Sequence, residues 1–487
     1  MIKKMMLALV AMAAMQMSGT VKIAIMSDIH TMSERLVVKD GAAIEKYAAS
    51  DSRMVRQSAD ILSTAIGQIT AQHPDVVMIS GDLTKDGERV SHELMASQLE
   101  RLKAKGIKVL VIPGNHDISN ANAKYYDGDD VRPAATINRN EFRQIYQHFG
   151  YGNDAVTDSA SLSYAIEPVK GLVVIGIDSN RDEENLLIAR GDSIDTYHTA
   201  GRIKASTLQW IADRAREARA QGKRVVAMMH HHLIEHFDSE ARLLKNYVVA
   251  DNERVAHTLV EAGIHTIFTG HLHISDIARA YIGGDSITEV ATGSMVFYPF
   301  HYRTATINLA DSTISIGTHQ IERVPSCPSL LLLGKRRVEK GASGLFGVMI
   351  NKMVAKLESA SKKISKYTAL LGGSAESFDF SKKKAAIKAL CHEKFDSLAT
   401  RACVMLLDGN EGRNPQSKPL IASFENAAME VVSEVLPKGV GDMLQGFIEE
   451  NVLPRLHTLL CSMLEDRNHC DTPSEVTVDD LNATFRF

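Results

Sequence analysis

The sequence carries almost no excess of charge of either sign. Its 487 residues include 55 lysines and arginines against 59 aspartates and glutamates, which gives a formal net charge of -4. Proteins that bind nucleic acid usually carry a basic excess, so the charge balance shows no nucleic-acid-binding signature. Hydrophobic residues make up 45% of the chain and charged residues 23%, the composition of a globular protein. At this length we expect two domains.

Cysteine is absent from the first two thirds of the chain. The five cysteines are Cys327, Cys391, Cys403, Cys461 and Cys470. In an exported protein, disulfides can staple a small helical unit, and we expect most of these cysteines to pair. Because the count is odd, either one thiol stays free or the pairing is incomplete, and the sequence leaves the connectivity open.

Long apolar runs are scarce, and the one at the N-terminus is too short to span a bilayer comfortably. Residues 1–20, "MIKKMMLALVAMAAMQMSGT", place Lys3 and Lys4 before a short apolar run that ends in small residues. This order is typical of a secretory signal peptide and predicts a periplasmic or extracellular protein, with no transmembrane segment after signal removal. The alternative is that these residues form an additional strand or helix of the fold.

Short apolar strands alternate with amphipathic helices over residues 21–323, which predicts a layered α/β domain. The predicted strands are "VKIAIMSD", "DVVMISGD", "KVLVIPGN", "GLVVIGID", "RVVAMMH", "HTIFTGH", "ITEVATG", "TATINLA" and "STISIGTH". Each of the first six ends in polar or glycine-rich sequence. Between two of them, "SHELMASQLERLKAKG" has apolar residues three and four apart and ends at a glycine, as an amphipathic helix does.

Beyond this domain the strand pattern stops, and residues 324–487 read as a helical C-terminal domain that ends in a polar tail. The helical pattern is broken at "GGSAES" and "GNEGRNPQSKP". Apolar stripes such as "GLFGVMINKMVAKL" favour packing faces over membrane-binding ones. The domain could cap an active site, form an oligomer contact or bind a surface; its role and the oligomeric state stay open.

Side chains of the types that bind metals or catalyse reactions stand at the carboxyl ends of five predicted strands. They are Asp28 and His30, then Asp82, then Asn115, His116 and Asp117, then His230, then His271 and His273. Ligands of open α/β folds bind at this edge of the sheet. A single strand-end histidine is usually structural, but five such motifs in order favour a functional site.

Carboxylate, imidazole and amide oxygen together suit borderline divalent metals such as zinc, manganese or iron, and there are enough donors for two ions. One site would use Asp28, His30 and His273, and the other Asn115, His230 and His271, with Asp82 as the bridge. Paired ions can polarise a phosphoryl group and generate a hydroxide at neutral pH. The sequence therefore predicts a dinuclear centre, of open metal identity, that acts on a small phosphoester.

The order Asp-x-His, Gly-Asp, Gly-Asn-His-Asp, His, Gly-His-x-His resembles the calcineurin-like metallophosphoesterases over residues 21–318. The resemblance implies a four-layer αββα sandwich with a dinuclear metal centre at the strand ends and the two ligand sets given above. It also implies that His116 is a non-ligand histidine near the leaving group and that Asp117 is the carboxylate that orients it. In "HHH" we take His230 as the ligand because it follows the apolar strand directly, and His231 stays possible.

One stretch after the bridging aspartate narrows the subfamily. The stretch "GDLTKDGE" is similar to the bacterial cyclic-nucleotide and glycerophosphodiester phosphodiesterase branch, so the resemblance implies a phosphodiesterase. A phosphomonoesterase or nucleotidase on the same scaffold is the alternative. Asp86 in this stretch matches no ligand position, and we expect Asp86→Ala to retain metal and activity.

Two other interpretations carry less weight. The run "HLHISD" superficially resembles the His-x-His-x-Asp-His motif of metallo-β-lactamase-like hydrolases, but its final histidine is missing and it comes late in the chain. A non-catalytic binding protein that acts through its helical tail would be expected to have lost at least one metal ligand, and none is lost.

Lys85 generates a spectroscopic prediction. Purple acid phosphatases carry an iron-binding tyrosine three residues after the bridging aspartate, and here that position holds Lys85. Without the tyrosinate, the iron-loaded, oxidised protein should show no strong charge-transfer band in the visible spectrum. A purple preparation would contradict the subfamily assignment.

Overall fold

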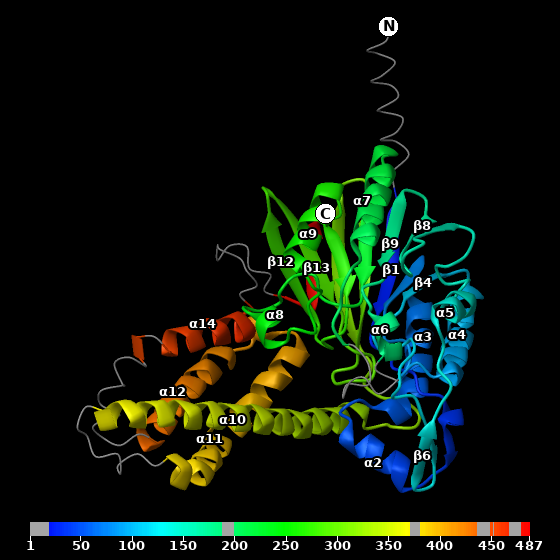
Figure 1. The fold of residues 1–487 in the computed structure, drawn as a ribbon. Coiled ribbons are helices and arrows are strands. Elements are labelled where there is room, and N and C mark those ends of the chain that lie inside the picture. Colours follow the sequence, from blue (N-terminus) through cyan, green and yellow to red (C-terminus); the bar gives the residue numbers. More distant parts are fainter. Residues whose placement is uncertain (1–18, 188–198, 371–379, 436–448, 451, 467–478) are drawn as a thin grey trace. The chain divides into compact units, whose positions relative to one another are not determined.

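The computed structural model describes residues 19–187, 199–370, 380–435, 449–450, 452–466 and 479–487. The predicted signal peptide lies outside these residues except for its last two positions, and so does Cys470. The chain divides into two units, one of Met1–Gly334 with Asn468–Phe487 and one of Lys335–Arg467. Each unit is described by itself, and Figure 1 labels their elements.

The first unit contains two large sheets. The six-stranded sheet has the order β16-β15-β14-β1-β3-β4, and the seven-stranded sheet has the order β12-β13-β11-β10-β9-β8-β7. The strands of the first are β1 (Thr20–Met26), β3 (Val76–Ser80), β4 (Lys108–Ile112), β14 (His301–Asn308), β15 (Thr313–Gln320) and β16 (Asn482–Arg486). Those of the second are β7 (Ala155–Thr157), β8 (Tyr164–Val169), β9 (Leu172–Ile177), β10 (Arg224–Met229), β11 (Thr266–Thr269), β12 (Asp276–Ile282) and β13 (Asp285–Ala291). All nine strands predicted from the sequence are present.

Parallel pairing sets the position of the site. Strands β1, β3 and β4 are parallel neighbours, and β9, β10, β11 and β13 form a second parallel group. The carboxyl ends of parallel strands meet at one edge of a sheet, so the loops after these strands gather there.

The main core lies between the two sheets, and strand alternation explains it. On β10, Val226 and Met228 belong to this core together with Ile23 and Ile25 of β1. The intervening residues of β10, such as Ala227, face a second core under α7 (Ala205–Ala220) and α9 (Asn252–Ala262). Since alternate residues of a strand point to opposite faces, a strand that is buried on both faces reads as a continuous apolar run.

Helices complete the layers. While α7 and α9 cover the seven-stranded sheet, α3 (Ser58–Gln72) packs on α4 (Arg89–Lys103), which lies on β4 of the other sheet (Figure 1). The predicted four-layer αββα sandwich is therefore confirmed. The remaining elements are the small sheet of β2 (Val37–Lys39), β5 (Lys124–Asp127) and β6 (Asp130–Pro133), and the short helices α2 (Ala42–Ser50), α5 (Arg139–Ile145), α6 (Asp182–Leu187) and α8 (Glu240–Leu243).

The second unit is helical, as the sequence predicts. Its helices are α10 (Leu330–Leu370, which begins in the first unit), α11 (Phe380–Asp408), α12 (Ser417–Val435) and α14 (Leu453–Leu464). The predicted break at "GNEGRNPQSKP" is the turn between α11 and α12, whereas "GGSAES" lies outside the described residues. Ile350 and Val354 of the stripe "GLFGVMINKMVAKL" are buried in a cluster with Ile387 and Val431, so this stripe is a packing face. No helix among the described residues is long and apolar enough to cross a membrane.

The C-terminus differs from the expected polar tail. Strand β16 pairs antiparallel with β15, and Phe485 packs against the core between the sheets. Exposed and partly buried residues alternate along β16, as expected of a strand at a sheet edge. The pattern was missed because its apolar residues are few and stand beside acidic ones.

The predicted disulfides are also wrong. Cys327, Cys391 and Cys403 carry free thiols, so most of the five cysteines do not pair. Cys391 is buried in an apolar cluster and Cys461 in another, where its Sγ lies 3.3 Å from Nε2 of His457. In the second unit, Cys391 and Cys461 therefore pack as small hydrophobic residues at the helix interfaces.

Candidate metal centre

The loops after five strands bring the predicted ligand residues together. The donor atoms form three overlapping groups, each with all atoms within 4.8 Å of one another. The groups are Asp28 with His30 and His273, His30 with Asp82 and His116, and Asp82 with His230 and His271. Residues after β1 and β3 of one sheet thereby meet residues after β10 and β11 of the other.

The backbone is strained where it presents these side chains. Five residues of the groups have φ in the left-handed region: Asp28 (50°), His30 (43°), Asp82 (49°), His271 (70°) and His273 (66°). Such conformations are costly for residues other than glycine and persist where the surrounding structure enforces them, typically at functional sites.

Two motif glycines permit the close approach of these loops. A Cβ atom on Gly114 would collide with the backbone nitrogen and the carboxylate of Asp82. A Cβ on Gly270 would collide with the hydroxyl of Ser27 and crowd the carboxylate of Asp28. The glycines of "PGNHD" and "TGHLH" are therefore needed for packing against the site.

One half of the centre surrounds a buried oxygen that lacks a hydrogen bond. Oδ2 of Asp28 accepts hydrogen bonds from the Ser27 hydroxyl and the His271 amide, but Oδ1 has no hydrogen-bond partner among the described residues. Nε2 of His273 lies 3.3 Å from this oxygen and 3.3 Å from Nε2 of His30. A buried acceptor without a donor is costly, and a cation between these atoms would satisfy it.

The other half brings acceptors together in the same way. Nδ1 of His230 donates to the carbonyl of Ser80 at 2.8 Å, so its Nε2 faces Oδ1 of Asn115 at 2.9 Å and Oδ2 of Asp82 at 3.5 Å. Burial alone would lower the pKa of His230, yet Asp82 raises it to about 9. The surroundings of His230 thus favour its protonated, positively charged form. A metal ion bound at this position would supply the positive charge instead.

His231 and His271 differ in which of their ring nitrogens are hydrogen-bonded. Both ring nitrogens of His231 are engaged away from the centre, with the hydroxyl of Ser179 and the carbonyl of Thr199. Nε2 of His271 lies 3.2 Å from the carbonyl of Asn246, which leaves its Nδ1 for the centre. Of the three histidines in "HHH", the first is therefore the one beside Asp82.

These separations fit metal ligands. Two ligand atoms that each lie about 2.0–2.1 Å from one ion are about 3.0–3.4 Å apart. The Nε2 atoms of His30 and His273 are 3.3 Å apart and fall within this range, whereas Nε2 of His30 is 3.6 Å from Oδ2 of Asp82 and has to come slightly closer for both atoms to bind one ion. Imidazole and carboxylate donors in this number suit zinc, manganese or iron.

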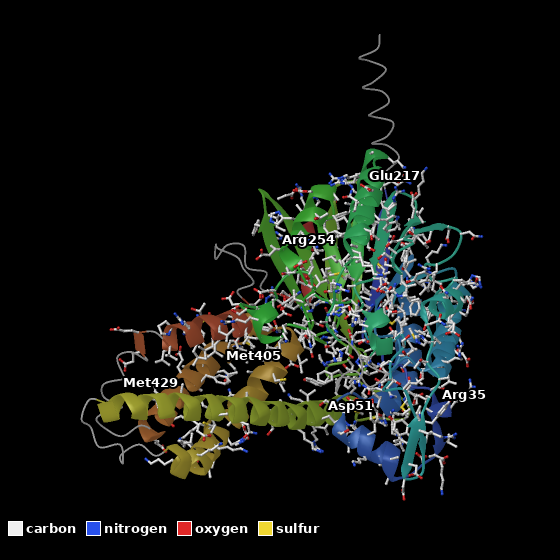
Figure 2. All side chains as sticks on the ribbon, viewed as in Figure 1. Arg35, Asp51, Glu217, Arg254, Met405 and Met429 are labelled. Carbon is white, nitrogen blue, oxygen red and sulfur yellow. The ribbon has the colours of Figure 1, made fainter. Side chains whose placement is uncertain are left out.

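One contact must open when His30 ligates an ion. Arg53 lies 3.0 Å from Nδ1 of His30, and arginine offers only donors, so this nitrogen accepts. A ring that ligates through Nε2 carries its proton on Nδ1 instead. Asp51, labelled in Figure 2, pairs with Arg53 at 2.8 Å and holds the guanidinium beside the centre.

Asp117 is not placed to orient His116. Oδ1 accepts hydrogen bonds from the amide and the hydroxyl of Thr84, and Oδ2 accepts from the amides of Leu83 and Gly114. The side chain turns back from the "GNHD" loop and ties it to the "GDLT" loop after β3. The expectation that Asp117 orients the imidazole of His116 is therefore wrong. This carboxylate instead connects the backbone of the two loops.

Asp86 takes the place that the sequence assigned to Asp117. Nδ1 of His116 lies 3.0 Å from Oδ1 of Asp86 and 2.9 Å from the carbonyl of Lys85. The buried ammonium of Lys85 pairs with Asp86 and lies 2.9 Å from Glu88. Sequence reasoning missed this network, although its signal was present as three charged residues directly after a buried strand and the bridging aspartate.

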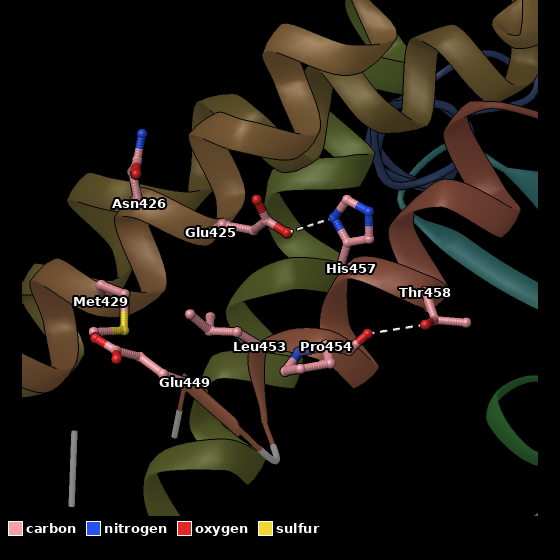
Figure 3. A pocket seen from close by; sticks show the side chains of 8 residues that line it. All are labelled: Glu425, Asn426, Met429, Glu449, Leu453, Pro454, His457 and Thr458. Carbon is pink, nitrogen blue, oxygen red and sulfur yellow. Dashed lines mark hydrogen bonds and ion pairs between the residues drawn. The ribbon is translucent and has the colours of Figure 1, made fainter. Parts of the chain in front are cut away.

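The second unit holds a cavity of about 550 Å³ of a different character (Figure 3). Its lining residues are Glu425, Asn426, Met429, Glu449, Leu453, Pro454, His457 and Thr458. Nδ1 of His457 pairs with Glu425 at 2.7 Å, and the hydroxyl of Thr458 donates to the carbonyl of Pro454. The described residues of this lining include no group of metal donors.

Comparison with known families agrees with this geometry. The family described as calcineurin-like phosphoesterase matches residues 21–275, which is more than half of the chain. The chain belongs to the calcineurin-like phosphoesterase family. Membership of this family supports a metal-dependent phosphoester hydrolase, and the groups of donor side chains offer places for metal ions. No curated protein matches the sequence closely enough to be reported as a relative.

Among solved structures, the chain is similar to a dimetal phosphatase from Danio rerio, with 14% identity and a TM-score of 0.42 over 62% of this chain and 96% of that one. It is also similar to the purple acid phosphatase PPD1 from yellow lupin (Lupinus luteus) seeds, with 11% identity and a TM-score of 0.34 over 62% and 52%. A third similarity is to the phosphopantetheinyl hydrolase of Mycobacterium tuberculosis, with 14% identity and a TM-score of 0.27 over 57% and 91%.

The role of Asp117 as a backbone clamp predicts a large effect on stability. Asp117→Ala leaves three buried amides without their acceptor, so the free energy of unfolding should fall by about 3–5 kcal/mol in urea denaturation. Asp154→Ala is the control, since it removes a carboxylate that forms an exposed pair with Lys108, and it should cost less than about 1 kcal/mol. A loss below about 1 kcal/mol for Asp117→Ala would contradict the clamp.

Proposed function

We propose that this protein is an exported phosphodiesterase with a dinuclear metal centre. The observation that carries the proposal is the position of Asp82, whose carboxylate lies in one donor group with His30 and His116 and in another with His230 and His271. Two donor groups that share a carboxylate suit a pair of ions rather than one. Export rests on the signal-like sequence of residues 1–20.

The proposed ligands divide into two sets. Asp28, His30, Asp82 and His273 would hold one ion, and Asp82, Asn115, His230 and His271 would hold the other. When bound, a pair of such ions polarises the phosphoryl group and supplies a hydroxide nucleophile at neutral pH. Asp82 is buried, so its charge can be matched only by cations held in this pocket.

His116 is the proposed acid for the leaving group. Its Nδ1 is held by Asp86 and the carbonyl of Lys85, both acceptors, so Nδ1 carries a proton and Nε2 points toward the centre, 4.0 Å from Oδ2 of Asp82. The ring is 12% exposed, which leaves it accessible to a substrate. The neighbouring carboxylates favour the charged imidazole, which can donate a proton from Nε2 to the departing alkoxide.

Arg53 is the proposed cation for the phosphate oxygens. Its guanidinium already lies beside His30 and must leave Nδ1 of that ring when the ring binds an ion. Asp51 keeps it within the site, since the two side chains form a fork-like pair. Arginine suits this role because its planar donors match phosphate geometry.

A panel of substrates tests whether the protein prefers phosphodiesters to phosphomonoesters. We expect purified protein to hydrolyse cyclic nucleotides or glycerophosphodiesters faster than nucleotide monoesters, and Asp82→Asn to lose both bound metal and all of these activities. Asp158→Asn, a change at a buried aspartate outside the centre, should retain both. Faster hydrolysis of the monoesters would favour the nucleotidase alternative, and full metal occupancy without Asp82 would contradict the dinuclear assignment.

Substitution of His116 or of Asp86 should reduce activity by a factor that depends on the leaving group of the substrate. His116→Ala should keep its metal but lose activity toward an alkyl phosphodiester by about 10²–10⁴-fold, and clearly less toward a nitrophenyl ester, whose leaving group departs without a proton. Asp86→Asn should shift activity in the same sense by a smaller factor, contrary to the expectation from sequence.

Glu88→Gln is the matched control for Asp86, because Glu88 also pairs with Lys85 but is not a hydrogen-bond partner of His116 in the described contacts. It should leave the ratio of the two ester activities unchanged. Equal losses on both esters for His116→Ala would show that the ring acts only through its charge.

A further inference from the structure

A second cluster of metal donors lies in the first unit, apart from the centre at the strand ends. His232 and His236 stand in the segment between β10 and α8, and Glu289 lies on β13. One donor atom from each of the three lies within 4.8 Å of the others, and all three side chains are buried. None of these residues matches a motif of the family, and the proposed function does not use them.

His232 presents a nitrogen that has no partner. Its Nδ1 lies 2.9 Å from Oε1 of Glu240, while Nε2 is buried and has no hydrogen-bond partner among the described residues. Glu240 is itself held by the backbone amide of His236 at 2.7 Å. The carboxylate therefore fixes the proton on Nδ1 and leaves the lone pair of Nε2 directed at the cluster.

His236 also lies between carboxylates, with one on each side of its ring. Its Nδ1 lies 3.2 Å from Oδ1 of Asp276 and its Nε2 lies 3.4 Å from Oε1 of Glu289, and neither nitrogen makes a well-formed hydrogen bond. A charged imidazole between two carboxylates would form bonds of about 2.7–2.9 Å. The observed separations are longer than this, although Asp276 and Glu289 outweigh burial and hold the pKa of His236 well above its usual value when no ion is bound.

Glu289 is held so that one oxygen remains available. Oε2 accepts hydrogen bonds from the amides of Leu233 and Ile234, and Oε1 accepts one from the hydroxyl of Thr269 at 2.6 Å. Each carboxylate oxygen has two lone pairs, so Oε1 retains one. Hydrogen bonds of this kind orient carboxylates that bind metals.

We propose that Nε2 of His232, Nε2 of His236 and a carboxylate oxygen of Glu289 form a third metal site, which binds a zinc ion. Two histidines with one glutamate are a known zinc ligand set, and the 3.4 Å between Nε2 of His236 and Oε1 of Glu289 matches ligands of a tetrahedral ion, about 3.3–3.4 Å apart. The partners Glu240 and Asp276 have the place of the carboxylates that orient metal-bound histidines.

Charge supports the same assignment. Three buried carboxylates, those of Glu240, Asp276 and Glu289, surround two imidazoles. Buried negative charge has to be paired or bound to a metal ion, and a divalent cation balances most of it while the rings stay neutral. The ion would tie the loop after β10 to β13.

The experiment first weakens the centre at the strand ends by removing one ligand of a single ion and the ligand shared by both, and then tests whether the remaining zinc depends on Glu289 and His236. The full chain with Asp82→Ala and His273→Ala, saturated with zinc and desalted, should retain one zinc ion per chain by elemental analysis. Adding Glu289→Gln, which keeps the shape and the amide contacts of this side chain, or His236→Gln should remove that ion. Adding His301→Gln, a change at a buried histidine whose Nδ1 binds the Ser275 hydroxyl, should leave it.

Thermal unfolding gives a readout that does not depend on activity. Zinc should raise the melting temperature of the Asp82→Ala, His273→Ala chain and have no effect after Glu289→Gln. Absence of zinc from the first chain would overturn the proposal and leave His236 as part of an ion-paired cluster. Retention of zinc in folded Glu289→Gln and His236→Gln chains would equally overturn it, and circular dichroism establishes that each chain is folded.

Discussion

The active-site region depends on the burial of one carboxylate, that of Asp82, among histidines from two sheets. Coulombic attraction to His230, His116 and His30 holds the pKa of Asp82 well below its usual value despite the penalty of burial. A buried charge of this kind has to be compensated, so the surrounding loops are arranged to bring cations or protonated rings to it. The strained backbone at Asp28, His30 and Asp82 is acceptable because this arrangement requires it.

The sandwich supplies the rigidity for this arrangement. Strands β1 and β3 end beside β10 and β11 of the facing sheet, and the apolar core between the sheets sets the spacing of those ends. Asp117 then ties the loop after β4 to the loop after β3 by three hydrogen bonds and closes its own loop by a fourth, from the amide of Gly114. The positions of the donors thus follow from core packing and backbone bonding rather than from the donors themselves.

Much of this could be predicted because the relevant signals are local. The strands are apolar runs that end in polar residues, and each predicted ligand residue stands directly after one. The partners of those residues were harder to predict. His116 and Asp117 are adjacent in sequence, but successive side chains in a turning loop diverge, so adjacency did not make Asp117 the partner. Asp86 reaches His116 from another loop, and β16 forms only because a distant edge strand accepts it.

The strand β16 makes the second unit an insertion between β15 and the end of the chain. Thr313 pairs with Arg486, so the six-stranded sheet is complete only after the helical unit has been synthesised. When β1 to β15 have been synthesised but β16 has not, the chain still exposes the edge of β15 and the apolar surface that Phe485 covers in the folded protein. Contacts of such long sequence separation form slowly, and unpaired edges promote association between chains. The first unit therefore cannot complete its six-stranded sheet until the helical unit has been synthesised.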